Sequence, residues 1–113
     1  MIYHDRARLV VAADSIDLTV GAEVFPLSTS DVLVLDGAAN VVTSKYRMVL
    51  APDPGIAAIR TAVGSDLRIG WGAWPLSPTP QFNEGLRLDG EIERHTVRGR
   101  LHHYEIIARR TVS

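Results

Sequence analysis

LRLDGEIERHTVRGRLHHYEIIARR, residues 86–110, is the stretch that decides how this chain folds. From Leu86 to Glu93, apolar residues or glycine alternate with charged residues, which is the period of two expected of a half-buried strand. A second such run extends from Leu101 to Arg110. The connection between the runs, 94–100, is polar and contains Gly99. Two such runs joined by a short glycine-containing loop predict a closing β-hairpin over 86–110.

Shorter segments with strand character precede this hairpin and must pair with it or pack against it. They cover residues 8–13, 16–20, 31–36, 41–50 and 66–72. The clearest of them, 41–50, is expected to form a hairpin with 31–36, because the turn between them contains Gly37 and Asn40, which accept positive φ. Residues 21–31 combine a proline with serine and threonine, which predicts a loop.

Prolines mark two further segments as irregular. The first, 51–66, begins with Pro52 and Pro54, which cannot donate hydrogen bonds to a strand ladder. Its part 56–63 has apolar residues at i, i+3 and i+7, so it is equally compatible with a short helix and with an extended loop. The second, 74–80, predicts an irregular connection.

The fold predicted from these segments is one mainly β domain over residues 1–113. It is a small β-barrel or β-sandwich of about six or seven short antiparallel strands, with at most one short helix. Hydrophobic residues make up 46% of the chain and charged residues 22%, so wholesale disorder is not expected.

Charge, cysteine content and the N-terminus exclude several classes of function. The formal net charge of -1 disfavours tight, generic binding of nucleic acid, which usually needs a basic excess. The absence of cysteine excludes disulfides, thiolate zinc ligands and thiol catalysis. The first residues carry no secretion signal, and the apolar run 9–13 is too short to cross a membrane. We therefore expect synthesis in the cytoplasm and no membrane role.

Histidines are the residues to consider as metal ligands. His102 and His103 are adjacent, so on a regular strand they point to opposite faces and do not bind one metal together. His95 can approach one of them across the hairpin, but no carboxylate is expected at a spacing that completes a site. Ordinary cross-strand packing is the favoured interpretation, and neither a metal nor another cofactor is predicted.

No catalytic motif stands out in the sequence. The chain has no Gly-x-Ser-x-Gly element, and Gly70-Trp71-Gly72 lacks the context of a phosphate-binding loop. Glu91 and Glu93 lie on one face of the predicted strand, but nearby arginines favour a solvated, salt-bridged surface. The chain is therefore not predicted to be an enzyme.

Trp71 and Trp74 lie in a stretch rich in glycine and proline. One interpretation is that both rings close an end of the core. The other is that at least one of them anchors a protein interface, where tryptophan is enriched. The sequence leaves both interpretations open.

Four short stretches carry a resemblance to a known family. They are Tyr46–Pro52, Ser65–Ile69, Leu88–Glu91 and Gly99–Glu105. Together they resemble the head-to-tail stopper, or head-completion, proteins of long-tailed bacteriophages (siphophages), especially those of actinobacterial hosts. In that family a strand that ends in a proline-containing turn leads to an Asp-led strand, and a hairpin with Gly-Arg in its connection closes the chain. The similarity extends over about residues 41–110.

The resemblance implies a structural protein of the virion neck, made in the host cytoplasm, without catalytic residues or cofactors. It implies a homo-oligomeric ring, a hexamer, between the portal-bound adaptor and the tail terminator protein. This ring seals the packaged genome and joins the tail. Double-stranded DNA passes through it without sequence-specific binding, and a near-neutral chain suits that passage because it adds little affinity for phosphates.

Two groups of residues are the candidates for contacts in such a ring. The interface is assigned to the two tryptophans and to charged residues of the hairpin, namely Trp71, Trp74, Arg87, Asp89, Glu91, Glu93, Arg98 and Arg100. The channel-facing or lateral loop is assigned to the segment that follows 41–50, namely Pro52, Asp53, Pro54, Gly55, Arg60 and Asp66.

Two other functions are compatible with the sequence. A true helix over 56–63 would favour a tail terminator or another tail-completion protein of the phage neck. A monomer with a formed pocket would favour a small cytosolic β-barrel binding module.

Overall fold

The computed structural model describes residues 2–32, 41–59, 66–80 and 84–112. Its elements are mainly strands, and their bounds in chain order are β1 (Asp5–Val11), η1 (Ala12–Asp14), β2 (Ile16–Val32), β3 (Val41–Leu50), η2 (Ile56–Ala58), β4 (Arg68–Gly70), β5 (Leu86–Leu88), β6 (Glu93–Val97) and β7 (Arg100–Val112). The two η elements are single 3-10 turns, and no longer helix is found among the described residues. The predicted mainly β fold is confirmed.

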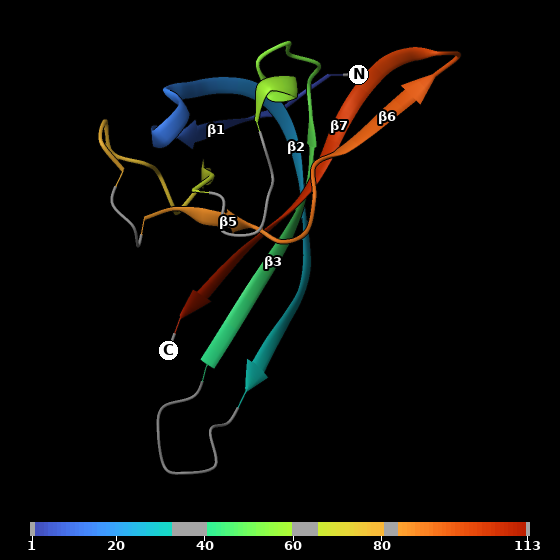
Figure 1. Cartoon of the computed structure of the whole chain (residues 1–113). Coiled ribbons are helices and arrows are strands. Elements are labelled where there is room, and N and C mark those ends of the chain that lie inside the picture. Colours follow the sequence, from blue (N-terminus) through green and yellow to red (C-terminus); the bar gives the residue numbers. More distant parts are fainter. Residues whose placement is uncertain (1, 33–40, 60–65, 81–83, 113) are drawn as a thin grey trace.

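The strands close into a barrel. They are hydrogen-bonded in the order β3-β2-β1-β4-β5-β7, and β7 pairs back with β3, so six antiparallel strands form a closed ring (Figure 1). The remaining strand, β6, lies outside this ring, and within the described ranges β7 is its one strand neighbour. Of the two architectures predicted, the barrel is the one observed. Closure pairs the backbone groups that an open sheet would expose along its edges.

The core lies inside this ring, because alternate residues of a strand point to its inner face. Leu9, Ile69 and Leu86 are direct neighbours across β1, β4 and β5, and each is fully buried. Each such side chain stabilises the fold by about 1.5–3 kcal/mol relative to an exposed one. Other fully buried residues complete the core, namely Met48, Leu50, Ile56, Leu67 and Ile106.

Strand β2 runs without interruption through the segment 21–31 that was predicted to be a loop, so that prediction is wrong. Its pairing with β3 shifts register between Pro26 and Thr29. Such a shift is typical of a β-bulge, and bulges are among the few places in a strand where proline is found. The expected strand 31–36 is the end of β2 as far as Val32, and its remaining residues lie outside those described.

The closing hairpin exists, but its strands and turn differ from those expected. The first strand does not run from 86 to 93, because it breaks after β5 and resumes as β6. Gly90 lies in the break with a φ of 95°, and the backbone N–H of Asp89 donates to the carbonyl of Ile107 at 2.8 Å. The expected connection 94–100 is also wrong, because most of it forms β6.

The hairpin turn consists of Arg98 and Gly99 alone, both with positive φ, at 52° and 76°. Two consecutive residues with positive φ are typical of the two-residue turns that match the twist of paired strands. Arginine is an uncommon residue at the first of these positions, where Asn or Asp is preferred. The sequence suggested a longer loop because residues 94–100 are polar and contain Gly99.

The segment after β3 closes one end of the barrel. Its helical part is the single turn η2, and Ile59 already has extended angles (φ -77°, ψ 123°). Ile56 and Ile59 are both buried, so this segment is anchored on the core. Residues 60–65 lie outside those described, so the remainder of the predicted helix or loop 56–63 is not placed.

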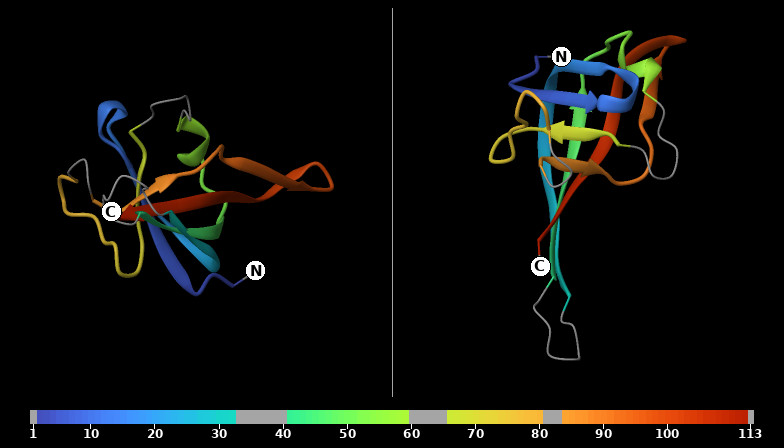
Figure 2. Two further views of the ribbon diagram at one scale, coloured as in Figure 1. Left: turned by 90° about the horizontal axis from the view of Figure 1, so that it is seen from below. Right: turned by 60° about the vertical axis from the view of Figure 1, so that its left-hand side comes forward.

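Two hairpins extend past the barrel in different directions (Figure 2). One is the far part of β2 and β3, with the end of β7 paired beside β3, which we call the arm (residues 27–32, 41–45 and 109–112). The other is the β6–β7 hairpin, which projects near the end of the barrel that η2 closes (Figure 1). These extensions draw the molecule out to 52 × 28 × 26 Å.

The close packing at Gly85 leads to a first prediction. Gly85 has a φ of 71°, and a Cβ atom built there would lie 2.7 Å from the carbonyl oxygen of Ile69. Gly72 has a similar φ of 58°, but a Cβ there meets nothing within 4 Å. We expect Gly72→Ala to lower the free energy of unfolding by about 1 kcal/mol, the cost of positive φ alone. Gly85→Ala should cost about 3 kcal/mol or more, because the backbone must also move.

Urea denaturation of both variants measures the difference between them. Equal losses of unfolding free energy would contradict the prediction, because they would show that a Cβ atom at residue 85 fits beside the carbonyl of Ile69 without movement of the backbone.

Candidate functional site

Polar side chains gather on the outer face of β7, where it lies between β3 and β6. On β7 the core-facing residues Tyr104, Ile106 and Ala108 alternate with outward-facing ones. The pairing of β6 with β7 places Glu93 directly opposite Glu105, and His95 directly opposite His103. Members of one strand two residues apart share a face, so all four of these residues lie together on the outside of the hairpin.

The rings of the two histidines stack face to face across the hairpin. Their centroids are 4.8 Å apart and the planes are inclined by only 10°. The Nε2 atom of His95 lies 3.0 Å from Oε1 of Glu93 and 2.9 Å from Oε2 of Glu105. The Nε2 atom of His103 lies 3.3 Å from Oε1 of Glu105. Glu105 is therefore the centre of the cluster.

Arg47 on β3 completes the surroundings of Glu105. Its Nη2 donates to Oε1 of Glu105 at 2.6 Å. The side chain of Glu105 is only 11% exposed, whereas that of Arg47 is 49% exposed. Burial by itself would raise the pKa of Glu105, but the hydrogen bond and charge of Arg47, with further contributions from His95 and His103, hold that pKa below the ordinary value of a glutamate.

A β-bulge brings a third histidine to the cluster. The register of β6 and β7 shifts between His95 and Thr96, because Leu101 and His103 pair with these two consecutive residues and His102 is the extra one. Nδ1 of His102 lies 2.8 Å from Nδ1 of His103, and the two rings meet edge to face. The expectation that adjacent histidines separate to opposite faces holds for a regular strand and is wrong here.

Glu105 supplies the carboxylate that was not expected from the sequence. The signal that could have revealed it is a histidine and a glutamate two residues apart on each strand, as in His103-Tyr104-Glu105 and Glu93-Arg94-His95. One ligand atom from each of His95, His103 and Glu105 lies within 4.8 Å of the others, a grouping that could hold a metal ion.

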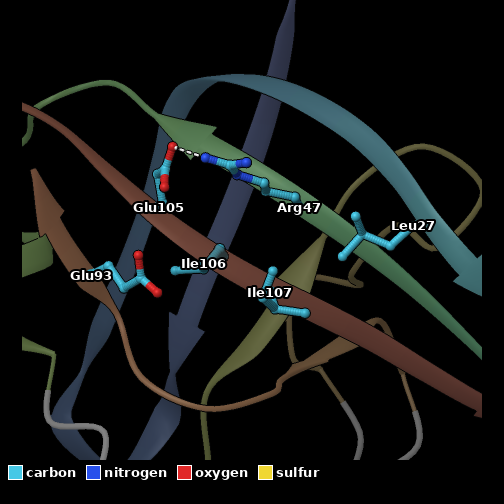
Figure 3. Close-up of a pocket in the computed structure, with 6 residues that line it drawn as sticks. All are labelled: Leu27, Arg47, Glu93, Glu105, Ile106 and Ile107. Carbon is cyan, nitrogen blue, oxygen red and sulfur yellow. Dashed lines mark hydrogen bonds and ion pairs between the residues drawn. The ribbon is translucent and has the colours of Figure 1, made fainter.

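A pocket of about 350 Å³ adjoins the cluster (Figure 3). Arg47, Glu93 and Glu105 form its charged side, and the Arg47–Glu105 pair is drawn as a dashed line in Figure 3. The side chains of Leu27 and Ile107 lie on its apolar side. Because Leu27 belongs to the arm and Glu93 to the β6–β7 hairpin, the pocket lies between these two extensions.

The two predicted tryptophans pack against the barrel. Trp71 and Trp74 are joined by a pair of backbone hydrogen bonds of 3.2 and 3.0 Å. The ring of Tyr46 contacts both indoles, with centroid distances of 5.2 and 5.4 Å, and all three rings border the core. Both indoles keep part of their surface exposed, so a further role at an interface stays a prediction.

The charged residues predicted on one strand face are in fact separated. Arg87 on β5 lies between Arg68 and Arg109 on the neighbouring strands. Burial, with the charges of these two arginines, lowers the pKa of Arg87. Asp89 pairs with Lys45 at 2.9 Å. The break after β5 is the reason for the separation, since it ends the strand alternation that would have aligned Arg87, Asp89, Glu91 and Glu93 on one face.

The other predicted interface residues are exposed. Glu91 lies in the break after β5, Glu93 begins β6, Arg98 occupies the hairpin turn and Arg100 begins β7. The structure brings only Glu93 of these to the histidine cluster.

The predicted loop residues are partly placed. Pro52 and Pro54 are exposed, and Oδ1 of Asp53 accepts a hydrogen bond of 2.8 Å from the backbone N–H of Gly55. Asp66 is also exposed, and Arg60 lies outside the described residues.

Comparisons with known proteins identify no relative. No family model, curated protein or solved structure matches the chain. Within the described ranges, no helix has the length and apolar character needed to cross a membrane.

The Arg47–Glu105 pair leads to a second prediction. Arg47→Met keeps the apolar stem and removes the charge that faces a mostly buried carboxylate, so we expect a loss of about 1–2 kcal/mol of unfolding free energy at pH 7. Because the folded pKa of Glu105 is lowered, its contribution is present above the unfolded value of about 4.3 and is lost as the pH falls through the folded pKa. The variant should therefore lose less stability on acidification than the parent.

Urea denaturation at neutral pH and at about pH 3.5 tests both expectations. Arg100→Met, which changes an exposed arginine at the start of the same strand, is the matched control and should leave both values unchanged. A parent and Arg47→Met variant with the same dependence on pH would contradict the prediction.

Proposed function

We propose that this chain is a structural subunit of the neck of a long-tailed bacteriophage. In this proposal, copies of the chain form a closed ring between the portal-bound adaptor and the tail terminator, which seals packaged DNA and joins the tail. The motif resemblance over about residues 41–110 supports the family, and the arm is the observation that carries the assembly.

The arm continues past the last fully buried side chains that the structure describes on β3 and β7. These are Met48 and Ala108. A narrow ribbon of strands is marginally stable by itself in water. Phe25 at the base of the arm and Leu27 within it are 50% and 41% exposed. A neighbouring subunit that covers these side chains would stabilise the arm and the ring together.

A ring needs two different complementary surfaces on each subunit, because its contacts are head-to-tail. The arm supplies one projecting surface. The β6–β7 hairpin supplies another on a different side of the barrel, where Val97 is 52% exposed. The net charge of -1 suits a channel for DNA, since strong attraction to phosphates would retard passage.

The proposal also assigns a role to the segment that follows β3. The segment 51–59 lies at the end of the barrel opposite the arm (Figure 1). Its prolines, Pro52 and Pro54, are exposed, and buried Ile56 and Ile59 anchor it on the core. We assign this end to the channel or to a lateral contact. Because of the buried isoleucines, substitutions at Pro52 and Pro54 are better tests of this assignment than a deletion, which would damage the fold.

The third prediction tests the arm as an assembly surface. Phe25→Ser combined with Leu27→Ser should abolish ring formation, because it removes exposed apolar area that a neighbour would cover, while leaving the melting temperature of the monomer nearly unchanged. Light scattering and negative-stain images of the purified protein, alone and mixed with its adaptor, measure assembly. Ile2→Ser, which changes another exposed apolar residue (77% exposed), is the control and should leave rings intact.

Two results would count against the proposal. One is a double variant that assembles as well as the parent. The other is a gene neighbourhood without portal, major capsid or tail-tube genes.

A small β-barrel binding module is the second candidate, and the pocket beside Arg47 and Glu105 is the observation that favours it. Light scattering separates the two candidates. A chain that stays monomeric in the presence of the adaptor, and that binds a small ligand in this pocket, would support the binding module.

A further inference from the structure

We propose that His95, His103 and Glu105 form a zinc-binding site on the outer face of the β6–β7 hairpin, with Glu93 as the fourth ligand. This inference goes beyond the neck function and does not depend on it. It rests on the arrangement of four side chains that two antiparallel strands bring to one face.

The strand register builds the site. Glu93 and His95 occupy one strand, and Glu105 and His103 occupy the positions directly opposite them. The four side chains, two carboxylates and two imidazoles, thus lie on one face of the hairpin. Directly opposed residues have Cβ atoms about 4.5–5.5 Å apart, which is close enough for both side chains to reach one ion.

The distances between donor atoms match those between zinc ligands. With bonds of about 2.0–2.2 Å and tetrahedral geometry, two ligand atoms on zinc lie roughly 3.3 Å apart. The Nε2 atoms of His95 and His103 lie 2.9 and 3.3 Å from oxygens of Glu105, and His95 lies 3.0 Å from Glu93. Small side-chain rotations therefore suffice to admit an ion.

Two neighbours hold the ligands in place. Nδ1 of His103 is hydrogen-bonded to Nδ1 of His102, so the other ring nitrogen of His103, Nε2, faces Glu105. Arg47 holds Oε1 of Glu105, and the other oxygen, Oε2, faces His95. Outer contacts of this kind orient the ligands of natural metal sites. The β-bulge at His102 is what brings the first of these neighbours into position.

The donor set and charge select the metal. Two imidazoles with carboxylates suit zinc, whereas calcium and magnesium prefer oxygen ligands alone. Glu93 and Glu105 carry two negative charges and Arg47 one positive charge, so the cluster is negative when the histidines are neutral. The side chain of His95 is 39% exposed, which leaves a path for the ion to enter.

A bound ion would connect β6 to the barrel. Strand β6 pairs only with β7 and has no other strand beside it among the described residues. Zinc would bind ligands on both strands, and Arg47 would extend the connection to β3. Because the ion binds the folded hairpin, it stabilises the folded state.

The test uses the full chain without a histidine tag, after removal of metals with a chelator. Titration with zinc chloride by calorimetry should show saturable binding of one ion per chain. Cobalt in its place should give the intense visible absorption of a tetrahedral site. His95→Ala, His103→Ala and Glu105→Gln should each weaken binding at least about 100-fold, and His102→Ala roughly 10-fold.

His4→Ala is the matched control, because His4 also contacts a glutamate, Glu23, but lies outside the hairpin. It should leave the affinity unchanged. Where a ligand variant fails to fold, as judged by circular dichroism, the ring signals of His95 and His103 in NMR spectra of the parent provide the second readout. They should shift on addition of zinc while those of His4 do not.

The absence of saturable zinc binding, or an affinity that His4→Ala lowers as much as His103→Ala, would overturn the proposal. The oligomeric state measured on the same samples keeps this result separate from the neck function. A chain that forms rings but binds no zinc rejects the site alone.

Discussion

The pairing of β3 with β7 is the interaction on which the rest of the structure depends. It extends from Val42 opposite Val112 to Leu50 opposite Tyr104 and turns an open sheet into a closed barrel. Closure joins two edges of the six-stranded sheet and encloses the core without a covering helix. The long β7 makes this possible, because it serves β3 along one side and both β5 and β6 along the other.

This shared strand also positions the polar cluster around Glu105. Because residues of β7 alternate between the core and the outside after the bulge at His102, Tyr104 and Ile106 fill the interior while Glu105 and Ile107 face outward. Glu105 therefore meets Arg47 from one neighbour and the histidines from the other. A mostly buried carboxylate is stable there only because these partners offset the cost of its burial.

The two extensions beyond the barrel give the proposed functions a common physical basis. The arm exposes the apolar side chain of Leu27 and the β6–β7 hairpin that of Val97, so each is suited to a contact that the barrel does not provide. For the arm, we assign that contact to a neighbouring subunit. For the hairpin, we assign it to an ion held between its own two strands, a role compatible with an isolated chain and with a ring.

By itself, the sequence determined the fold class and most strands, since alternation at 41–50 and 101–110 depends only on which residues must face the core. It also indicated that His95 could approach a histidine across the hairpin. The tertiary structure alone decided that β2 continues through Pro26, that Arg98 and Gly99 make the whole turn, and that His102 joins the cluster. The reason is that bulges and register arise from pairing with a partner strand distant in sequence, so the local pattern of residues does not contain them.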